Sequence, residues 1–511
     1  MFSKVLSGTL HGVDGRLIVV EADVSEGLPM FNMVGFLASE VREASDRVRT
    51  ALKNSGFHFS PKKITINLSP ADIRKEGSAF DLPISIALLA SYGFIPTECV
   101  ENTLFIGELS LNGELNGVRG ILSIADHARK QGINNIILPY VNRKEAAIIP
   151  EISVYGACNL KQVVEHLLDI KHIAKEEHTD FDDVSDDHYD MDFSDIKGQE
   201  SMKRATEIAV CGMHNILFVG PPGAGKSMIA KRIPTIMSEL SYDESVELTK
   251  IYSAKGMLAP EEGLISYRPF RTPHHSITAQ SLIGGGMIPK PGEISLSHNG
   301  VLFLDEMLEF NKNTLEMLRQ PIEDGVVTIS RMHGSYTFPC DFMLVAAMNP
   351  CPCGYFPDRS KCHCTKPQID RYIRRLSQPM LDRMDMCIQV KRIEYKELYG
   401  DSSFESSHDI KKRIISAQHI QKERLARYGV LFNSQIPANE LDEICMLGNN
   451  EKCLIKDMFE KLELTARGIN RILKVSRTIA DLDHSEDVRE KHILEALSYR
   501  INDLFNGGEG V

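Results

Sequence analysis

The residues from Gly220 to Ser227 form a complete phosphate-binding loop. The loop follows an apolar run at 215–219 that predicts a buried strand, and the residues after it predict a helix. Its glycines allow backbone N–H groups to point at phosphate oxygens, aided by the positive end of the helix dipole. We expect Lys226 to reach the β- and γ-phosphates and the Ser227 hydroxyl to bind Mg²⁺. The loop therefore predicts binding of ATP or GTP. The expected nucleotide contacts are Gly220, Pro221, Pro222, Gly223, Ala224, Gly225, Lys226 and Ser227.

A second apolar run, at 301–304, ends in Asp305 and Glu306. Phosphoryl transfer requires charge neutralisation and an aligned nucleophile, and carboxylates at the end of a buried strand suit both tasks. We expect Asp305 to lie near the Mg²⁺ and Glu306 to act on the attacking water. A third run, at 344–348, ends at Asn349, whose amide could contact the γ-phosphate or that water. The alternative for Asn349 is an ordinary turn, because Asn-Pro is a common turn dipeptide.

Two Cys-x-Cys pairs follow the third run. Four thiolates on two short turns could close a tetrahedral Zn²⁺ site and staple a loop that has no core of its own. The spacing is tighter than the usual Cys-x₂-Cys, so free thiols are the alternative, and His363 is a less suitable ligand. The four expected ligands are Cys351, Cys353, Cys362 and Cys364.

The elements that must position these residues belong to a chain of several domains. With 511 residues, the chain is too long for one hydrophobic core. Strand and helix patterns alternate between about 215 and 390, as in a doubly wound α/β nucleotide-binding core, and helical patterns dominate after 406. The N-terminal part mixes strands and helices as an α+β or α/β unit. We predict domains at 1–170, 196–395 and 396–511, with a linker at 171–195.

The linker carries most of the net charge. The chain has a formal net charge of −12, but the segment from Glu176 to Asp195 contains ten acidic residues and no Lys or Arg. The rest of the chain therefore carries only −2, and a nucleic-acid partner is not excluded. With 42% apolar and 25% charged residues, the composition is that of a soluble globular protein.

The sequence also indicates a compartment. The first residues lack the apolar run of a secretory signal, and no apolar stretch approaches the length that crosses a bilayer. We expect a cytoplasmic protein without a membrane segment. In that compartment the eleven cysteines are more often thiols or metal ligands than disulfides.

Several runs of residues resemble AAA+ ATPases, and more closely the ComM/YifB family of Mg-chelatase-like proteins. The resemblance covers nearly the whole chain. The runs that carry it are Arg268-Pro-Phe-Arg-Thr-Pro-His-His275, Leu282-Ile-Gly-Gly-Gly286, 289–300, Met348-Asn-Pro-Cys-Pro-Cys-Gly354, 376–385 and Thr465-Ala-Arg-Gly468. It implies an AAA+ P-loop core with a C-terminal helical lid.

This resemblance implies roles for further residues. Asn349 is similar to sensor 1, and Arg383 to the arginine finger that acts on the ATP of a neighbouring subunit. A guanidinium suits that task because it is always charged and can stabilise charge spreading over phosphate oxygens. Arg467 is similar to sensor 2, with Arg471 one helical turn on as the alternative. The finger implies a ring of copies, and members of the family are typically hexamers.

A predicted hairpin lies at 324–339. In helix-2-insert AAA+ proteins such a hairpin projects into the pore of the ring. The resemblance makes Arg331 and His333 near its tip, and Lys290 in the preceding Gly/Pro-rich insert, candidates for contacts with a DNA backbone. An ordinary hairpin with a solvated tip is the alternative.

The N-terminal part resembles the catalytic domain of Lon proteases, with a ribosomal-S5-like topology. An ungapped comparison places Ala79 where the nucleophilic serine belongs and Arg119 where the lysine belongs. Arginine stays protonated and cannot act as a base. Ser78 could serve only if the loop shifted by one residue. We therefore expect a domain without proteolytic activity, used for binding DNA or a partner and for oligomerisation.

The family resemblance implies a function. It is that of an ATP-driven ring motor of the helicase or branch-migration type, which acts on intermediates of homologous recombination or natural transformation. DNA, other copies of the chain and recombination proteins would be its partners. The alternative is a chelatase-like ATPase that remodels a protein or metal-insertion complex without DNA.

Overall fold

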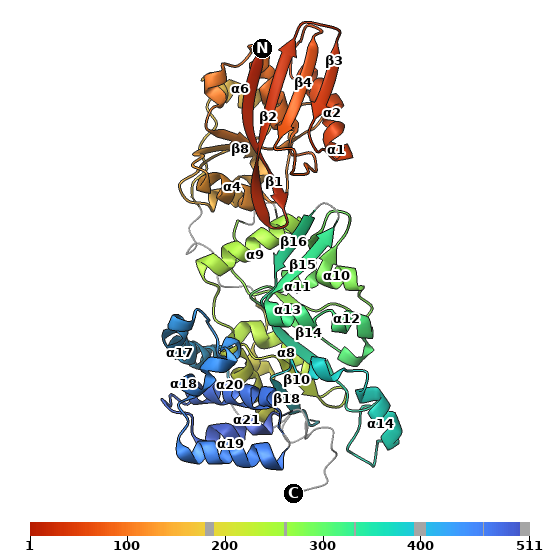
Figure 1. Cartoon of the computed structure of the whole chain (residues 1–511), viewed down its shortest axis with the longest axis vertical. Helices are drawn as coiled ribbons and strands as arrows, with labels where there is room; N and C mark the ends of the chain where they lie inside the picture. The colour runs from red at the N-terminus through yellow and green to blue at the C-terminus, as the bar shows by residue number, and fades with distance from the viewer. Residues whose placement is uncertain (179–188, 260–262, 332–333, 393–404, 463, 501–511) are drawn as a thin grey trace.

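The computed structural model describes residues 1–178, 189–259, 263–331, 334–392, 405–462 and 464–500. They form three parts stacked along the long axis, with an N-terminal sheet at one end, a second sheet in the middle and a helical bundle at the other end (Figure 1). The predicted linker at 171–195 lies only partly within the described residues. His333 lies outside them. No helix in the described ranges has the length and apolar character needed to cross a membrane.

The N-terminal part is built on a seven-stranded sheet with the order β3-β4-β2-β1-β5-β8-β9. Its central pair, β1 and β2, is antiparallel, with Phe2 opposite Asp23 and His11 opposite Asp14. The helix α3 is mostly apolar and is buried at every position. The elements are β1 (Phe2–His11), β2 (Asp14–Ser25), β3 (Met30–Val34), α1 (Ser39–Arg42), α2 (Ala44–Asn54), β4 (Lys63–Ser69), α3 (Asp81–Ser91), β5 (Thr103–Phe105), β6 (Glu108–Leu109), β7 (Leu115–Asn116), α4 (Ile121–Lys130), β8 (Asn135–Pro139), α5 (Arg143–Ala147), β9 (Ser153–Ala157) and α6 (Leu160–Leu167).

The middle part holds a five-stranded sheet with the order β11-β14-β17-β10-β18. All its pairs are parallel, and β10, β14 and β17 are buried at every position, as their apolar runs predict. The strands of this sheet are β10 (Ile216–Val219), β11 (Phe270–Arg271), β14 (Val301–Leu304), β17 (Met343–Met348) and β18 (Met386–Gln389). The other elements are α7 (Glu200–Gly212), α8 (Lys226–Ile236), α9 (Tyr242–Lys255), α10 (Ala279–Ile283), β12 (Gly284–Gly285), β13 (Lys290–Pro291), α11 (Glu293–Leu296), α12 (Lys312–Glu316), α13 (Arg319–Asp324), β15 (Val326–Arg331), β16 (Gly334–Pro339), α14 (Lys366–Ile373) and α15 (Gln378–Leu381).

The C-terminal part is helical, as predicted. Its helices α17 and α20 pack against α7, and their apolar faces join one continuous core with β10 and α8. Inside this bundle the buried Asp481 accepts from Arg424 (2.6 Å) and Arg477 (3.0 Å), which compensates a charge that would be costly to bury alone. The helices are α17 (Ser407–Leu425), α18 (Leu441–Cys445), α19 (Asn449–Lys461), α20 (Ala466–Leu482) and α21 (Glu490–Ser498).

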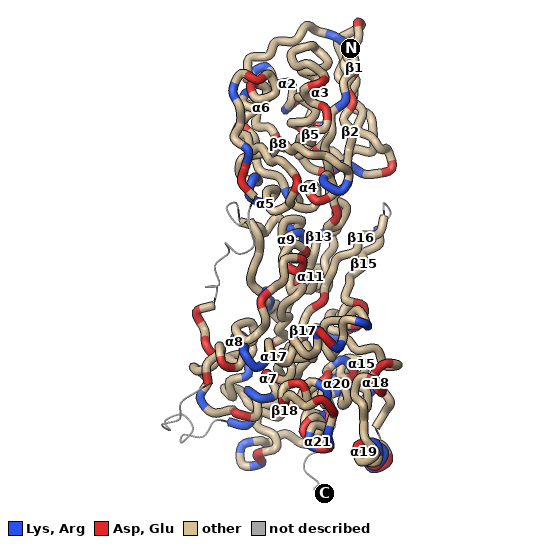
Figure 2. Tube along the Cα trace, turned by 90° about the vertical axis from the view of Figure 1, so that its left-hand side faces the viewer, with Lys and Arg blue, Asp and Glu red and all other residues tan. Residues whose placement is uncertain are grey.

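The N-terminal part is fixed to the middle part through α9. Ser253 accepts a hydrogen bond from the Gly120 backbone (2.8 Å) and donates one to the buried carboxylate of Glu145. Burial raises the pKa of Glu145, and its hydrogen bonds oppose that rise. One helical turn away, Lys250 pairs with Asp126 at 2.7 Å. These contacts hold the first sheet on top of the second, as seen in two views at right angles (Figures 1 and 2).

Candidate active site

The phosphate-binding loop lies at the carboxyl edge of the middle sheet, between β10 and α8. Since the strands are parallel, β14 and β17 end at the same edge. Lys226 Nζ donates to the carbonyl oxygens of Gly220 (2.6 Å) and Pro221 (2.9 Å), and lies 3.3 Å from Asn349 Oδ1. The loop lysine and the amide at the end of β17, which are 123 residues apart, are therefore in contact.

The two carboxylates at the end of β14 differ in their surroundings. Asp305 Oδ2 accepts a hydrogen bond from Ser227 Oγ at 2.6 Å. Asp305 Oδ1 accepts another from the Glu306 backbone at 2.9 Å. Glu306 has a left-handed backbone with a φ of 49°, and its side chain is exposed. Asp305 is thus hydrogen-bonded to the loop, whereas the exposed side chain of Glu306 makes no hydrogen bond or ion pair with a described residue.

These residues fit a nucleoside triphosphate with Mg²⁺. Lys226 is only 8% exposed, and its burial lowers its pKa against the opposing effect of Asp305 and Glu306. A cation that has lost water gains from an anionic ligand such as a phosphate. Ser227 and Asp305 offer the oxygen ligands that Mg²⁺ prefers, and a bound Mg²⁺ would neutralise charge on the phosphates.

A cavity of 380 Å³ lies at the carboxyl ends of β14 and β17, where Glu306 and Asn349 both line it. The carboxylate expected to act on water and the amide expected to contact the γ-phosphate therefore face the same space. The other lining residues are Glu309, Pro352, Cys364, Gln368, Arg371, Tyr372 and Arg375. Most of them belong to α14 or to the turns just before it, which the sequence did not connect with nucleotide chemistry.

The predicted finger, Arg383, is held away from this loop. Its guanidinium pairs with Glu323 at 2.6 Å and donates to the carbonyl oxygens of Arg319 (3.1 Å) and Pro379 (2.6 Å). The side chain is 12% exposed. The structure therefore does not bring Arg383 to the phosphate-binding loop of its own chain.

The two sensor 2 candidates lie in the first turns of α20 and have different surroundings. Arg471 donates to the carbonyl oxygen of Met384 (2.9 Å) and approaches Asp382 at 3.4 Å, so it binds the segment that also carries Arg383. Arg467 is exposed and makes no side-chain hydrogen bond or ion pair with a described residue. Arg467 thus remains available for a ligand, and Arg471 is occupied within the chain.

Gln199 is a contact of the loop that the sequence did not reveal. Its backbone is left-handed, with a φ of 60°, and its amide donates to the carbonyl oxygens of Ala224 (3.3 Å) and Lys391 (2.6 Å). It thus ties the phosphate-binding loop to the end of β18. The signal was Gly198-Gln199 directly before a helix, which by itself indicates only a turn.

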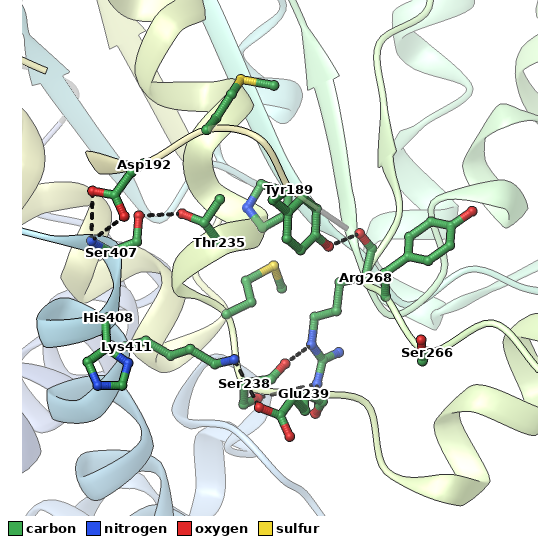
Figure 3. A pocket seen from close by; sticks show the side chains of 14 residues that line it. Tyr189, Asp192, Thr235, Ser238, Glu239, Ser266, Arg268, Ser407, His408 and Lys411 are labelled. Atoms are coloured by element: carbon green, nitrogen blue, oxygen red, sulfur yellow. Dashed lines mark hydrogen bonds and ion pairs between the residues drawn. The ribbon is translucent and has the colours of Figure 1, made fainter. Parts of the chain in front are cut away.

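A separate pocket of 280 Å³ lies at the other end of α8 from Lys226 (Figure 3). Here Asp192 accepts from the Ser407 backbone at 3.1 and 3.2 Å, and Ser407 Oγ lies 2.8 Å from Thr235 Oγ1. Close by, Lys411 of α17 pairs with Glu239 at 3.0 Å. None of the predicted catalytic residues lines this pocket. Its contacts join the segment before α7, the end of α8 and the first helix of the bundle.

Of the residues expected to contact DNA, Arg331 and Lys290 lie within the described ranges and differ in their surroundings. The predicted hairpin is present as β15 and β16, which lie beside the N-terminal part (Figure 2). The ring of Tyr336 in β16 lies 4.5 Å from that of His11, with the two planes tilted by 30°. Arg331 is exposed and donates to the carbonyl oxygen of Gly286 at 3.2 Å. Lys290 lies instead in a cavity between the two parts, where burial and the nearby Arg119 and Lys255 lower its pKa.

That cavity, of 420 Å³, also contains the positions that the Lon comparison assigns to the nucleophilic serine and the lysine. Ser78, Ala79 and Arg119 all line it. Ser78 Oγ donates to Glu108. The serine is therefore engaged by a carboxylate, and Arg119 is the cation at the position expected for a lysine.

The four predicted cysteine ligands come together. Their sulfur atoms all lie within 4.8 Å of one another, which suits four ligands of one ion. Cys351 and Cys362 are buried, and Cys353 is exposed. Among the described residues, these four cysteines form the one group with metal-ligand spacing.

The fold and the composition of this site define an AAA+ protein of the Mg-chelatase type. Residues 192–398 match the family model for magnesium chelatase, subunit ChlI. Residues 20–142 match the model for subunit ChlI of Mg-chelatase, and residues 404–500 match the model for its C-terminal region. The predicted fold class is confirmed.

The chain belongs to the ComM/YifB family. It is 41% identical to the YifB protein of Salmonella typhimurium over 493 residues, which cover 96% of each chain. It is 39% identical to the competence protein ComM of Haemophilus influenzae over 506 residues, or 97% of each chain. A weaker similarity, 26% over 200 residues, relates 33% of the chain to 35% of Lon protease 2 of Bacillus subtilis.

Proposed function

We propose that the protein hydrolyses ATP at a site shared between copies in a ring, and that it uses the energy to move along DNA. The observation that carries this proposal is the contact of Lys226, Ser227, Asp305 and Asn349 at one sheet edge. These residues supply phosphate binding, a Mg²⁺ site and a polar amide at the place where a γ-phosphate would lie.

Each residue of the site has a separate role in the proposed ATP hydrolysis. Lys226 and the backbone of the loop bind the phosphates, and Ser227 with Asp305 would hold the Mg²⁺. Glu306 orients a water molecule and accepts its proton while the water oxygen attacks the γ-phosphorus and the bond to ADP breaks. Asn349 hydrogen-bonds to the phosphate or the water from the neighbouring strand.

A ring explains the position of Arg383. A guanidinium that points away from its own loop contributes to hydrolysis only if it reaches a nucleotide on another copy. The ion pair with Glu323 at 2.6 Å would keep it ordered until a neighbouring ATP competes for it. We expect a hexamer, as is typical of the family.

The proposal that DNA is the substrate is based on the relatives of the chain. One relative is a competence protein, so uptake and integration of DNA is the process we favour. Movement of the ring along a strand would drive branch migration of recombination intermediates. Arg331, exposed near the hairpin tip, is the residue we expect to contact a phosphate backbone.

The proposal predicts that DNA stimulates ATP hydrolysis. We expect branched or single-stranded DNA to raise the hydrolysis rate and the protein to displace a labelled strand from a three- or four-way junction. Lys226→Ala is the control and should lose both activities. Hydrolysis that is indifferent to DNA, without strand displacement, would replace this function with a chelatase-like remodelling activity.

We propose further that the four clustered cysteines bind Zn²⁺. Purified protein should contain about one Zn²⁺ per chain by elemental analysis, since a tetrathiolate site of this kind holds a single ion. A Cys351→Ser/Cys353→Ser double variant should lose the metal. Cys453→Ser, at an exposed cysteine of α19, is the matched control and should keep it. Equal metal content in the two variants would show that the cluster does not hold the metal.

A further inference from the structure

We propose that Arg371 is a further ATP-site residue, which binds the terminal phosphate of the nucleotide from α14 of the same chain. The proposal rests on the ATPase function above and adds a cation to that site. It begins from the cavity of 380 Å³ that Glu306 and Asn349 share with α14.

The helix α14 presents two different faces. Gln368, Arg371 and Arg375 line the cavity and are spaced by three and four residues, so they lie on one side of the helix and its last turn. Ile369 and Ile373, four residues apart, pack instead against the buried Cys351 and Cys362. The apolar face therefore packs the helix against the cysteine turns, and the polar face lines the same cavity as Glu306.

The anchoring is coupled to the phosphate-binding loop. Gly354, within the first cysteine turn, lies so close to the loop that an added Cβ would come within 2.7 Å of Pro222. Its φ of 85° also favours glycine. Because the cysteine turns touch the loop on one side and α14 on the other, they fix where Arg371 lies relative to the phosphates.

Arg371 and Arg375, the two cations of this face, differ in their contacts with described residues. Arg375 pairs with Glu309 at 3.2 Å and also donates to the Leu308 carbonyl oxygen. Arg371 is exposed and makes no side-chain hydrogen bond or ion pair with a described residue. A guanidinium with free donors beside a catalytic carboxylate and an amide is suited to a phosphate, which accepts two parallel hydrogen bonds from it.

A contact with the terminal phosphate has a specific consequence. Lys226 and the loop also hold the phosphates that ADP retains, whereas Arg371 would act on the phosphate that only ATP carries. Removal of Arg371 should therefore reduce the preference for triphosphate over diphosphate, rather than nucleotide binding in general.

The test compares Arg371→Ala with Arg374→Ala in the full-length protein. Arg374 is an exposed arginine at the end of the same helix and does not line the cavity, so it controls for charge and for helix stability. Fluorescence titration with a non-hydrolysable ATP analogue and with ADP, both with Mg²⁺, gives the two affinities.

We expect Arg371→Ala to weaken binding of the analogue roughly tenfold, as loss of a charge-assisted contact does, and to leave ADP binding unchanged. Arg371→Lys should restore part of the loss. Arg374→Ala should behave as the wild type. The inference is overturned if the two alanine variants bind alike, or if Arg371→Ala loses ATP analogue and ADP equally, which would indicate a purely structural role.

The failure of this inference is distinguishable from failure of the proposed function. If the wild type hydrolyses ATP and the two alanine variants behave alike, only the role of Arg371 is wrong. If the wild type binds nucleotide but hydrolyses none, the ATPase proposal fails, and the titration still decides whether Arg371 contacts the terminal phosphate.

Discussion

Replacement of Glu306 by glutamine is expected to abolish ATP turnover while ATP binding persists. Asp305, which Ser227 contacts at 2.6 Å, would keep the Mg²⁺ ligands, and Lys226 would keep the phosphates. Only the group that accepts a proton from water is removed. Loss of a general base costs on the order of 10²–10⁴-fold in rate. Steady-state hydrolysis assays and fluorescent-nucleotide titration measure the two quantities on the same preparation.

The matched control is Glu316→Gln on α12. Glu316 pairs with Arg319 at 2.6 Å and does not line the cavity of the site, so its neutralisation should leave turnover nearly unchanged. If Glu306→Gln hydrolysed ATP at the rate of this control, Glu306 would not be the base. The roles proposed for Asp305 and Glu306 at the end of β14 would then both need revision.

Replacement of Arg383 by alanine is expected to reduce hydrolysis about 10³-fold or more, as removal of an arginine finger does. Arg383 contacts Glu323, Arg319 and Pro379 rather than the phosphate-binding loop of its own chain. Unlike Glu306, it would therefore act on the ATP of a neighbouring copy. ATP affinity measured on single chains should therefore stay close to that of the wild type. Hydrolysis by the assembled protein should be lost.

Arg319→Ala is the control for this variant. Arg383 contacts only the backbone carbonyl oxygen of Arg319, which the substitution keeps. Size-exclusion chromatography with light scattering, run with ATP analogue present, shows whether both variants still assemble. An assembled Arg383→Ala protein with wild-type turnover would rule out the finger.

The sequence predicted those parts of the site that depend on local patterns. A phosphate-binding loop between a strand and a helix dictates its own conformation, so Lys226 and Ser227 follow from the motif alone. The carboxyl ends of parallel strands meet at one edge, so Asp305 and Asn349 could be placed beside the loop once their apolar runs were recognised. The helical character of the chain after 406 followed from periodicity in the same way.

Local sequence patterns could not predict the contacts between segments that are distant in the chain. Nothing in the residues around Gln199 shows that its amide reaches the backbone of Lys391, 192 residues away. Nor does the sequence show that Lys290 and Arg119, 171 residues apart, line one cavity once the N-terminal part docks through α9. The sequence also does not show that one side of α14 lines the cavity of the site. Which side does so depends on where the cysteine turns pack against the helix.

The central claim is that each ATP is hydrolysed between two copies, with Lys226 of one and Arg383 of the other. A mixture of Lys226→Ala and Arg383→Ala proteins tests it most directly, with ATP hydrolysis in the presence of DNA as the measurement. Each variant alone should be inactive. In mixed rings, Arg383 of the Lys226→Ala chain can serve the intact loop of the Arg383→Ala chain, so we expect activity to return. A mixture as inactive as its components, with co-assembly verified, would contradict a shared site.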